Sequence, residues 1–109
     1  MPVYAVPSLS PEAERAINVL GANAARLAVL SFISAHPKSL VSEITKGTGL
    51  THSTVKQHVS SLTAAGVLNP DPDPSVPYAD RRGRHTRYEA NAERLAEDYL
   101  ELGKLLGLR

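Results

Sequence analysis

The stretch Ser39–Gly66, SLVSEITKGTGLTHSTVKQHVSSLTAAG, decides how this chain folds. Its glycines at positions 47 and 49 separate two segments with helical hydrophobic spacing. Because successive helix residues turn by about 100°, one face of the second segment is apolar and consists of Val55, Val59 and Leu62. No acidic residue occurs between Glu43 and Asp71. We therefore predict two short helices joined by a turn, the second with a polar face free of carboxylates.

A polar helix face without carboxylates suits contact with nucleic acid, because the phosphate backbone is negatively charged. In a helix-turn-helix, the second helix enters the major groove of duplex DNA. Its first turn can receive a phosphate, and Lys56 and Gln57 are long enough to reach base edges. The residues expected to contact DNA are His52, Ser53, Thr54, Lys56, Gln57 and Ser60. The alternative is that they are ordinary solvated side chains.

The composition of the 109-residue chain limits the other possibilities. This length supports one domain with a single modest core. The chain has no cysteine, which excludes disulfides and thiolate metal sites. It has neither an apolar run long enough to cross a membrane nor the pattern of a secretion signal, so we expect a cytoplasmic protein without a membrane partner. No catalytic motif is visible, and we predict neither an enzyme nor a bound cofactor.

Capping residues and breakers predict about five helices. The candidate caps are Ser10, Asn23, Ser39, Thr51 and Asn91. The candidate stops are Gly21, His36-Pro37, Gly47 and Gly66, and the last helix reaches about Leu106. Residues 1–9 carry prolines and no period, so they are expected to form an extended arm.

A short β-hairpin is expected between the fourth and last helices. Val67-Leu68 resembles a strand, but the four prolines that follow restrict it to a sheet edge or a stiff loop. The segment 84–90 alternates and forms the returning strand. At the tip, three arginines can reach phosphates or the minor groove, or form an ordinary basic turn: Arg81, Arg82 and Arg84. Arg87 can instead pair with Glu89 or Asp80.

Charge is unevenly distributed along the chain. Positive charge is concentrated in residues 38–68 and 80–90, the turn-helix unit and the hairpin. The proline-rich insert Asn69–Asp80 between them is acidic, and Asp71 and Asp73 would repel phosphates. The insert can hold the hairpin away from DNA or contact another protein.

Helices in this order with a basic hairpin follow the winged helix-turn-helix plan, and the chain resembles the arsenic-repressor-type (ArsR) family of bacterial transcriptional regulators. The likeness is carried by LGANAARLAVL (Leu20–Leu30), EITKGTGLTHSTVKQHVSSLTAAGVL (Glu43–Leu68) and RRGRHTRYEAN (Arg81–Asn91). It implies a mainly α fold with a small β-hairpin, as one winged helix-turn-helix domain over residues 10–109. It also implies a homodimer on double-stranded DNA whose terminal helices form the interface.

The last helix, residues 91–107, has an apolar stripe with two interpretations. Spacings of four, three and four place Leu95, Tyr99, Leu102 and Leu106 on one face. The stripe can dock on its own domain or pair with the first helix and a second copy of the chain. The resemblance implies the second arrangement, with an interface formed by Ile17, Leu95, Tyr99, Leu102 and Leu106.

Metal sensing, which the resembled family often performs, is not expected in this chain. Many such proteins use cysteines near the third helix or histidine and carboxylate ligands on the last helix. Here the matching third-helix stretch is SLVSEIT, and the last helix has no histidine. The acidic residues of that helix are expected to form a solvated face: Glu93, Glu97, Asp98 and Glu101. His58 is expected to be packed or backbone-bonded, a metal ligand being the alternative.

The sequence thus predicts a sequence-specific, homodimeric repressor that binds a pseudo-palindromic operator without metal sensing. Any small-molecule effector stays open. Two alternatives remain: a protein-interaction adaptor built on a winged helix, and an architectural or mobile-element accessory DNA-binding protein.

Overall fold

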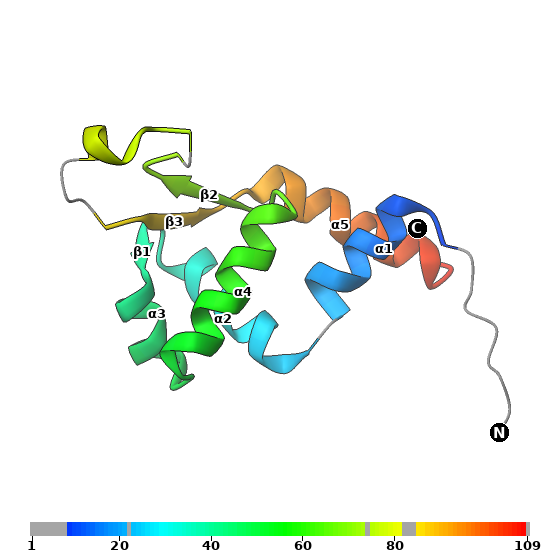
Figure 1. The fold of residues 1–109 in the computed structure, drawn as a ribbon. Coiled ribbons are helices and arrows are strands. Elements are labelled where there is room, and N and C mark those ends of the chain that lie inside the picture. Colours follow the sequence, from blue (N-terminus) through cyan, green and yellow to red (C-terminus); the bar gives the residue numbers. More distant parts are fainter. Residues whose placement is uncertain (1–8, 22, 74, 82–84, 109) are drawn as a thin grey trace, which may run out of the picture.

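The computed structural model describes residues 9–21, 23–73, 75–81 and 85–108 (Figure 1). Across these ranges five α-helices accompany a small three-stranded antiparallel sheet, which is the predicted winged helix-turn-helix fold. The helices are α1 Pro11–Ala16, α2 Ala24–Ala35, α3 Val41–Thr48, α4 His52–Ala64 and α5 Ala92–Leu105. A π-helical segment, η1 Ile17–Gly21, continues α1, and a 3-10 turn, η2 Tyr78–Arg81, precedes the last strand. The arm predicted for residues 1–9 lies, except for Leu9, outside the described residues.

Four of the predicted caps begin helices as expected. The side-chain oxygens of Ser10, Asn23, Thr51 and Asn91 each accept a hydrogen bond from a first-turn backbone N–H, at 3.1, 2.8, 3.3 and 3.2 Å respectively. Each such cap contributes about 1 kcal/mol, because it satisfies a donor that the helix end leaves free. Gly66 follows α4 with a left-handed φ of 83°, as its predicted role as a stop requires.

The start of the third helix differs from the prediction. Ser39 does not cap it, because Ser39 and Leu40 form strand β1 (Ser39–Leu40) and pair with β3 (Arg87–Ala90). The Ser39 hydroxyl donates to the carbonyl oxygen of His36, inside the preceding turn. At the start of α3, the backbone N–H of Leu40 donates to Glu43 Oε1 at 2.8 Å. A two-residue strand carries no alternation, so the sequence could not reveal it.

One other helix end also differs from the prediction. The stop after α3 is Gly49, with a left-handed φ of 73°, whereas Gly47 stays inside the helix. The ring of Phe32 lies against Gly47, so the missing side chain provides room for helix packing instead of a break. The first helix changes from α to π geometry after Ala16 and ends at Gly21, the predicted stop.

The sheet has the order β1-β3-β2, with β3 in the centre and β2 (Leu68–Asp71) at an edge. Pro70 lies in β2 opposite Tyr88, so the proline-rich segment occupies the edge position that the sequence predicted. Along β3, Arg87 and Glu89 are exposed while Tyr88 and Ala90 are half-buried, which confirms the predicted alternation.

The core lies between the helices of the turn-helix unit, α2 and the start of the sheet. Val55, Val59 and Leu62 of α4 are buried, as the helical spacing predicted. They join a cluster formed with Val19, Val29, Leu30, Ile33, Ile44, Val67 and Leu68. Leu50 packs against this cluster from the turn between α3 and α4. Burial of each such side chain stabilises the fold by about 1.5–3 kcal/mol. The apolar face of α4 therefore fixes the orientation of this helix firmly.

Helices α1 and α5 pack side by side with η1 and form an arm that extends from the rest of the domain (Figure 1). The molecule is correspondingly elongated, with extents of 52 × 27 × 26 Å. Within the arm, Arg15 Nε donates to Asp98 Oδ1 at 2.9 Å, and Asp98 is completely buried. The predicted solvated position of Asp98 is therefore wrong, because α1 covers this side of α5.

No single helix in the described ranges is long and apolar enough to cross a membrane. Length and composition suffice only when Pro11–Gly21 and Ala24–Ala35 are taken together, and these two segments are bent by 84°.

Candidate nucleic-acid interface

The exposed face of α4 carries the polar residues that the sequence singled out. His52, Ser53, Lys56, Gln57 and Ser60 are all exposed, opposite the buried Val55, Val59 and Leu62. Thr54 differs from them, because it is half-buried and its hydroxyl accepts a hydrogen bond from the Thr51 hydroxyl at 2.8 Å. Thr54 thus takes part in the N-terminal cap of α4, while the other five side chains are free to meet a partner surface.

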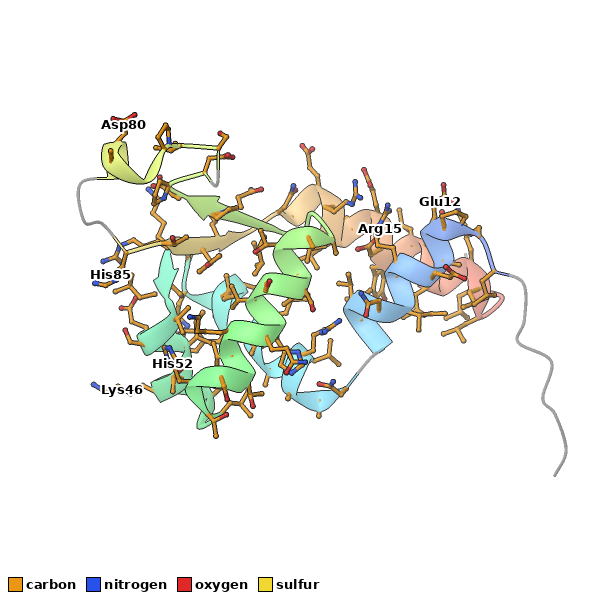
Figure 2. The ribbon with its side chains drawn as sticks, in the orientation of Figure 1. Glu12, Arg15, Lys46, His52, Asp80 and His85 are labelled. Atoms are coloured by element: carbon orange, nitrogen blue, oxygen red, sulfur yellow. The ribbon has the colours of Figure 1, made fainter. Side chains whose placement is uncertain are left out.

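The amino-terminal end of α4 faces solvent, and His52 there borders the same groove as His85. In the view of Figure 2, His52 and Lys46 lie at one end of the molecule and His85 lies above them on the strand side. Glu12 and Arg15 lie on the arm at the opposite end (Figure 2). A helix start with exposed hydroxyl, imidazole and ammonium groups suits an anion such as a phosphate.

A groove separates α4 from the sheet. Its first part, about 470 Å³, is lined by Lys56, Ser60 and Thr63 of α4 and by Pro70, Pro72 and Tyr88 of the strand side. A second part, about 650 Å³, is lined by His52, Lys56, Ser42, His85, Thr86 and Tyr88. Lys56 and Tyr88 border both parts. The Tyr88 hydroxyl, like that of an ordinary tyrosine, is protonated and can donate a hydrogen bond at neutral pH, and burial raises its pKa further.

Among the hairpin arginines, Arg81 ends η2, whereas Arg82 and Arg84 lie outside the described residues. Arg87 does not pair with Glu89 or Asp80 as expected. Its guanidinium donates to the carbonyl oxygen of Lys38 at 3.0 Å and lies 3.6 Å from Glu43 Oε1. This exposed pair joins the central strand to α3, and at such exposure it contributes at most about 1 kcal/mol.

His58 is packed inside the domain, as predicted. It is 7% exposed, and its Nδ1 accepts a hydrogen bond from Arg26 Nε at 3.2 Å. Burial, and secondarily the charge of Arg26, lowers the pKa of His58. The described ranges contain no group of three or more His, Asp or Glu side chains placed to hold a metal ion.

Sequence reasoning missed Arg26. It is 8% exposed and bonds both to His58 and to Asn18. The sequence offered one indication of a buried role, because Arg26 is the single charged residue of the AARLAVLSFISA helix. A lone charge in a core helix requires buried partners, and the sequence alone does not say which.

The residues predicted for a dimer interface divide into two groups. Ile17, Leu95 and Leu102 are half-buried, and Leu95 packs against the core of its own chain. Tyr99 and Leu106 are 72% and 66% exposed, and Leu100, Leu105 and Leu108 of the same region are exposed as well. An apolar cavity of about 500 Å³ beside Tyr99 is lined by Leu20, Leu27, Leu30, Leu95 and Ala96.

The fold and the exposed face of α4 define a winged helix-turn-helix protein of the class that regulates transcription. The chain belongs to the MarR family, whose sequence profile matches residues 20–75. This finding confirms the predicted winged-helix class and corrects the expected family, since ArsR proteins form a related but different family. The turn-helix motif is shared among winged regulators and could not separate the two. Because MarR family proteins are transcription regulators, the prediction that the chain is not an enzyme is confirmed.

Two solved structures share this fold. A MarR family transcription regulator aligns with a TM-score of 0.56 and 12% identity, over 88% of this chain and 61% of that one. The multiple antibiotic-resistance repressor (MarR) from Listeria monocytogenes 4b F2365 aligns with a TM-score of 0.53 and 15% identity, over 88% of this chain and 66% of that one. The chain therefore spans less than two thirds of the length of either structure. No curated protein matches the sequence.

Proposed function

We propose that this chain is a sequence-specific DNA-binding regulator that represses transcription as a homodimer on a pseudo-palindromic operator. The observation that carries the proposal is the composition of the exposed face of α4. Five exposed side chains there can donate hydrogen bonds, and no carboxylate lies among them. A solvated helix without a partner has no physical reason to exclude acidic residues, whereas a helix that approaches phosphates does.

The contacts are divided by the chemistry of each side chain. Lys56 and Gln57 extend furthest from α4 and read base edges, lysine at guanine and glutamine at adenine. His52, Ser53 and Thr54 stand at the helix start and position the phosphate backbone, and Ser60 continues the face by one further turn. The arginines at 81, 82 and 84 supply phosphate or minor-groove contacts from the hairpin.

Dimerisation occurs through the arm. Tyr99 and Leu106 lie on one face near the end of α5, and Leu100, Leu105 and Leu108 around them are exposed as well. Such clustered exposed apolar side chains are typical of interaction surfaces. A twofold pairing of arms would place two α4 helices about one DNA turn, roughly 34 Å, apart. The absence of cysteine supports regulation without a thiolate metal site.

Selection of binding sites from random duplex DNA tests this proposal. We expect an enriched palindromic motif with half-sites about one helical turn apart. The double substitution Lys56→Ala with Gln57→Ala should reduce the ratio of operator to random-DNA affinity about 10- to 100-fold, since each base contact contributes about 1–3 kcal/mol of discrimination. Lys104→Ala removes the same charge from the arm and serves as the matched control.

The outcomes separate the alternative functions. Unchanged discrimination after the double substitution would refute base reading by α4. Enrichment of no motif, together with strongly salt-dependent binding, would indicate the architectural alternative. Negligible DNA binding at low salt would indicate the protein-interaction adaptor.

A further inference from the structure

A buried arginine joins the recognition helix α4 to the arm. Arg26 stands near the start of α2, and its Nε donates to His58 Nδ1 on the buried side of α4 at 3.2 Å. One terminal nitrogen donates to the carbonyl oxygen of Asn18 at 2.9 Å and to its Oδ1 at 2.8 Å. Asn18 belongs to η1, which packs on α5. One side chain therefore connects α2, α4 and the arm, and we call Arg26, His58 and Asn18 the joint.

The joint holds a positive charge without a compensating carboxylate. Throughout the described ranges no Asp or Glu pairs with Arg26, and all of its bonding partners are neutral. A buried charge of this kind is costly, and apolar residues of similar volume are often more stabilising. Arg26 thus contributes more to the geometry of the junction than to the stability of the core.

The joint lies where η1 meets the rest of the domain, beside Val19 of η1, which is buried in the core. The path from α1 to α2 leaves α geometry at η1, and π-helical segments of this kind occur frequently at functional sites. On the other side, α5 reaches the core through Leu95 and through the bond from the Asn91 N–H to the Val67 carbonyl at 2.8 Å. Within the described part of the chain, the Arg26 bonds form a polar link from η1 through α2 to α4.

We propose that Arg26 is a positioning residue that fixes the recognition helix relative to the arm, and that protonation of His58 releases it. The consequence for DNA binding rests on the proposed function, because in a dimer this orientation sets the distance between the two recognition helices.

The chemistry of the release follows from the hydrogen bond. Nδ1 of His58 can accept from Arg26 only while it carries no proton. A proton taken from solvent would turn Nδ1 into a donor that faces another donor, and would place two positive charges together. Burial and Arg26 lower the pKa of His58, so release requires a pH below the ordinary histidine value of 6.5. The other charged groups on the neighbouring α3 and β2 are exposed: Glu43, Lys46 and Asp71.

A pair of spin labels, one on α4 and one on α5, can measure how firmly the joint holds α4 relative to the arm in the absence of DNA. The chain has no cysteine, so Ala64→Cys on α4 and Glu97→Cys on α5, both at exposed positions, would carry two labels without background. Dilution into unlabelled protein restricts the distance to one chain. We expect a narrow distance distribution near pH 8 that broadens at an acidic pH below 6.5, where His58 becomes protonated.

Two variants and a control test the assignment. Arg26→Lys keeps the charge but lacks the fork that reaches both partners, so the distribution should be broad at both pH values. His58→Asn places an amide oxygen near the position of Nδ1 and cannot be protonated, so its distribution should stay narrow at both. His36→Asn changes an exposed histidine and should behave as the natural chain. If Arg26→Lys fails to fold, the comparison of the natural chain with His58→Asn still decides the matter.

DNA binding gives the second measurement. With operators of varied half-site spacing, Arg26→Lys should weaken the preference for the best spacing about tenfold while leaving the half-site sequence and the salt dependence unchanged. Narrow distance distributions for every variant at both pH values would overturn the proposed role of the joint and leave the proposal of DNA binding unaffected. Absence of DNA binding by the natural chain would instead overturn the proposed function and leave the spin-label result standing.

Discussion

Replacing Gly47 with alanine is expected to destabilise the protein, although alanine is the better helix former. Gly47 lies inside α3, and an added Cβ would lie 2.1, 2.6 and 2.9 Å from Cε2, Cδ2 and Cζ of Phe32. The Phe32 ring must therefore move, and it stacks on His36 with ring centroids 4.3 Å apart. Overpacking costs about 1–3 kcal/mol, against a helix-propensity gain of about 1 kcal/mol. We expect a net loss of about 1 kcal/mol, or roughly 4–8 °C in Tm.

Gly103→Ala provides a matched control for this prediction. Gly103 also lies in a helix, but the nearest atom to an added Cβ is Leu108 Cβ at 3.9 Å, an ordinary contact. This variant should be stabilised by up to about 1 kcal/mol. Urea unfolding at one fixed protein concentration measures both free energies.

Removal of the Phe32 ring isolates the cause. In a Phe32→Ala background the overlap disappears, so Gly47→Ala should change from destabilising to stabilising. If Gly47→Ala stabilises the natural chain as much as Gly103→Ala does, the steric reasoning is refuted. The same conclusion follows if the sign does not change in the Phe32→Ala background.

Four other predictions follow from single features. The pKa of His58 is lower in the folded chain than in the unfolded chain, so the unfolded chain takes up its proton first as the pH falls. The free energy of unfolding should therefore fall as the pH drops below about 6.5. In unfolding titrations, His58→Asn should lack this part of the pH dependence. Arg15→Ala should lower the free energy of unfolding by about 3 kcal/mol in thermal unfolding, because it leaves the buried Asp98 without its partner. Asp98→Ala should lower it less, because Arg15 is partly exposed and can regain contact with water. Equal losses of stability in the two variants would contradict this reasoning. Arg81→Ala, Arg82→Ala and Arg84→Ala should each flatten the salt dependence of DNA binding by about 0.9 log units for each phosphate that the arginine neutralises, with the selected motif unchanged. Leu106→Ser with Tyr99→Ser should shift the chain toward monomer in sedimentation, whereas Glu93→Ser on the same helix should not.

The sequence predicted the positions of the helices better than their exact ends. Caps such as Thr51 and Asn91 act within four residues, so the bonds they form can be inferred from neighbouring letters. The apolar face of α4 could be predicted from helical spacing for the same reason. Ser39 failed as a cap because β1 depends on pairing with residues 87 and 88, far along the chain. Such a long-range contact leaves no local pattern.

Buried polar groups were the other part of the structure that the sequence did not predict. Asp98 resembles a solvated charge in the sequence, and Arg26 stands out only as a lone charge in its helix. Nothing near either residue identifies its partners, which are Arg15 for Asp98 and His58 and Asn18 for Arg26. Tertiary packing decides their burial. The candidate face of α4 was visible in the sequence because exposed residues depend least on such partners, whereas the joint behind it became visible only in three dimensions.

Pro70 in β2 has a consequence for the behaviour of the protein in a crowded solution. The outer strand of a small sheet normally offers free backbone donors, on which another chain can build a further strand. Pro70 lacks such a donor, and the charged Asp71 follows it at the end of the strand. The wing is therefore a poor template for intermolecular strand addition, and copies of the chain at high concentration should resist aggregation through this edge.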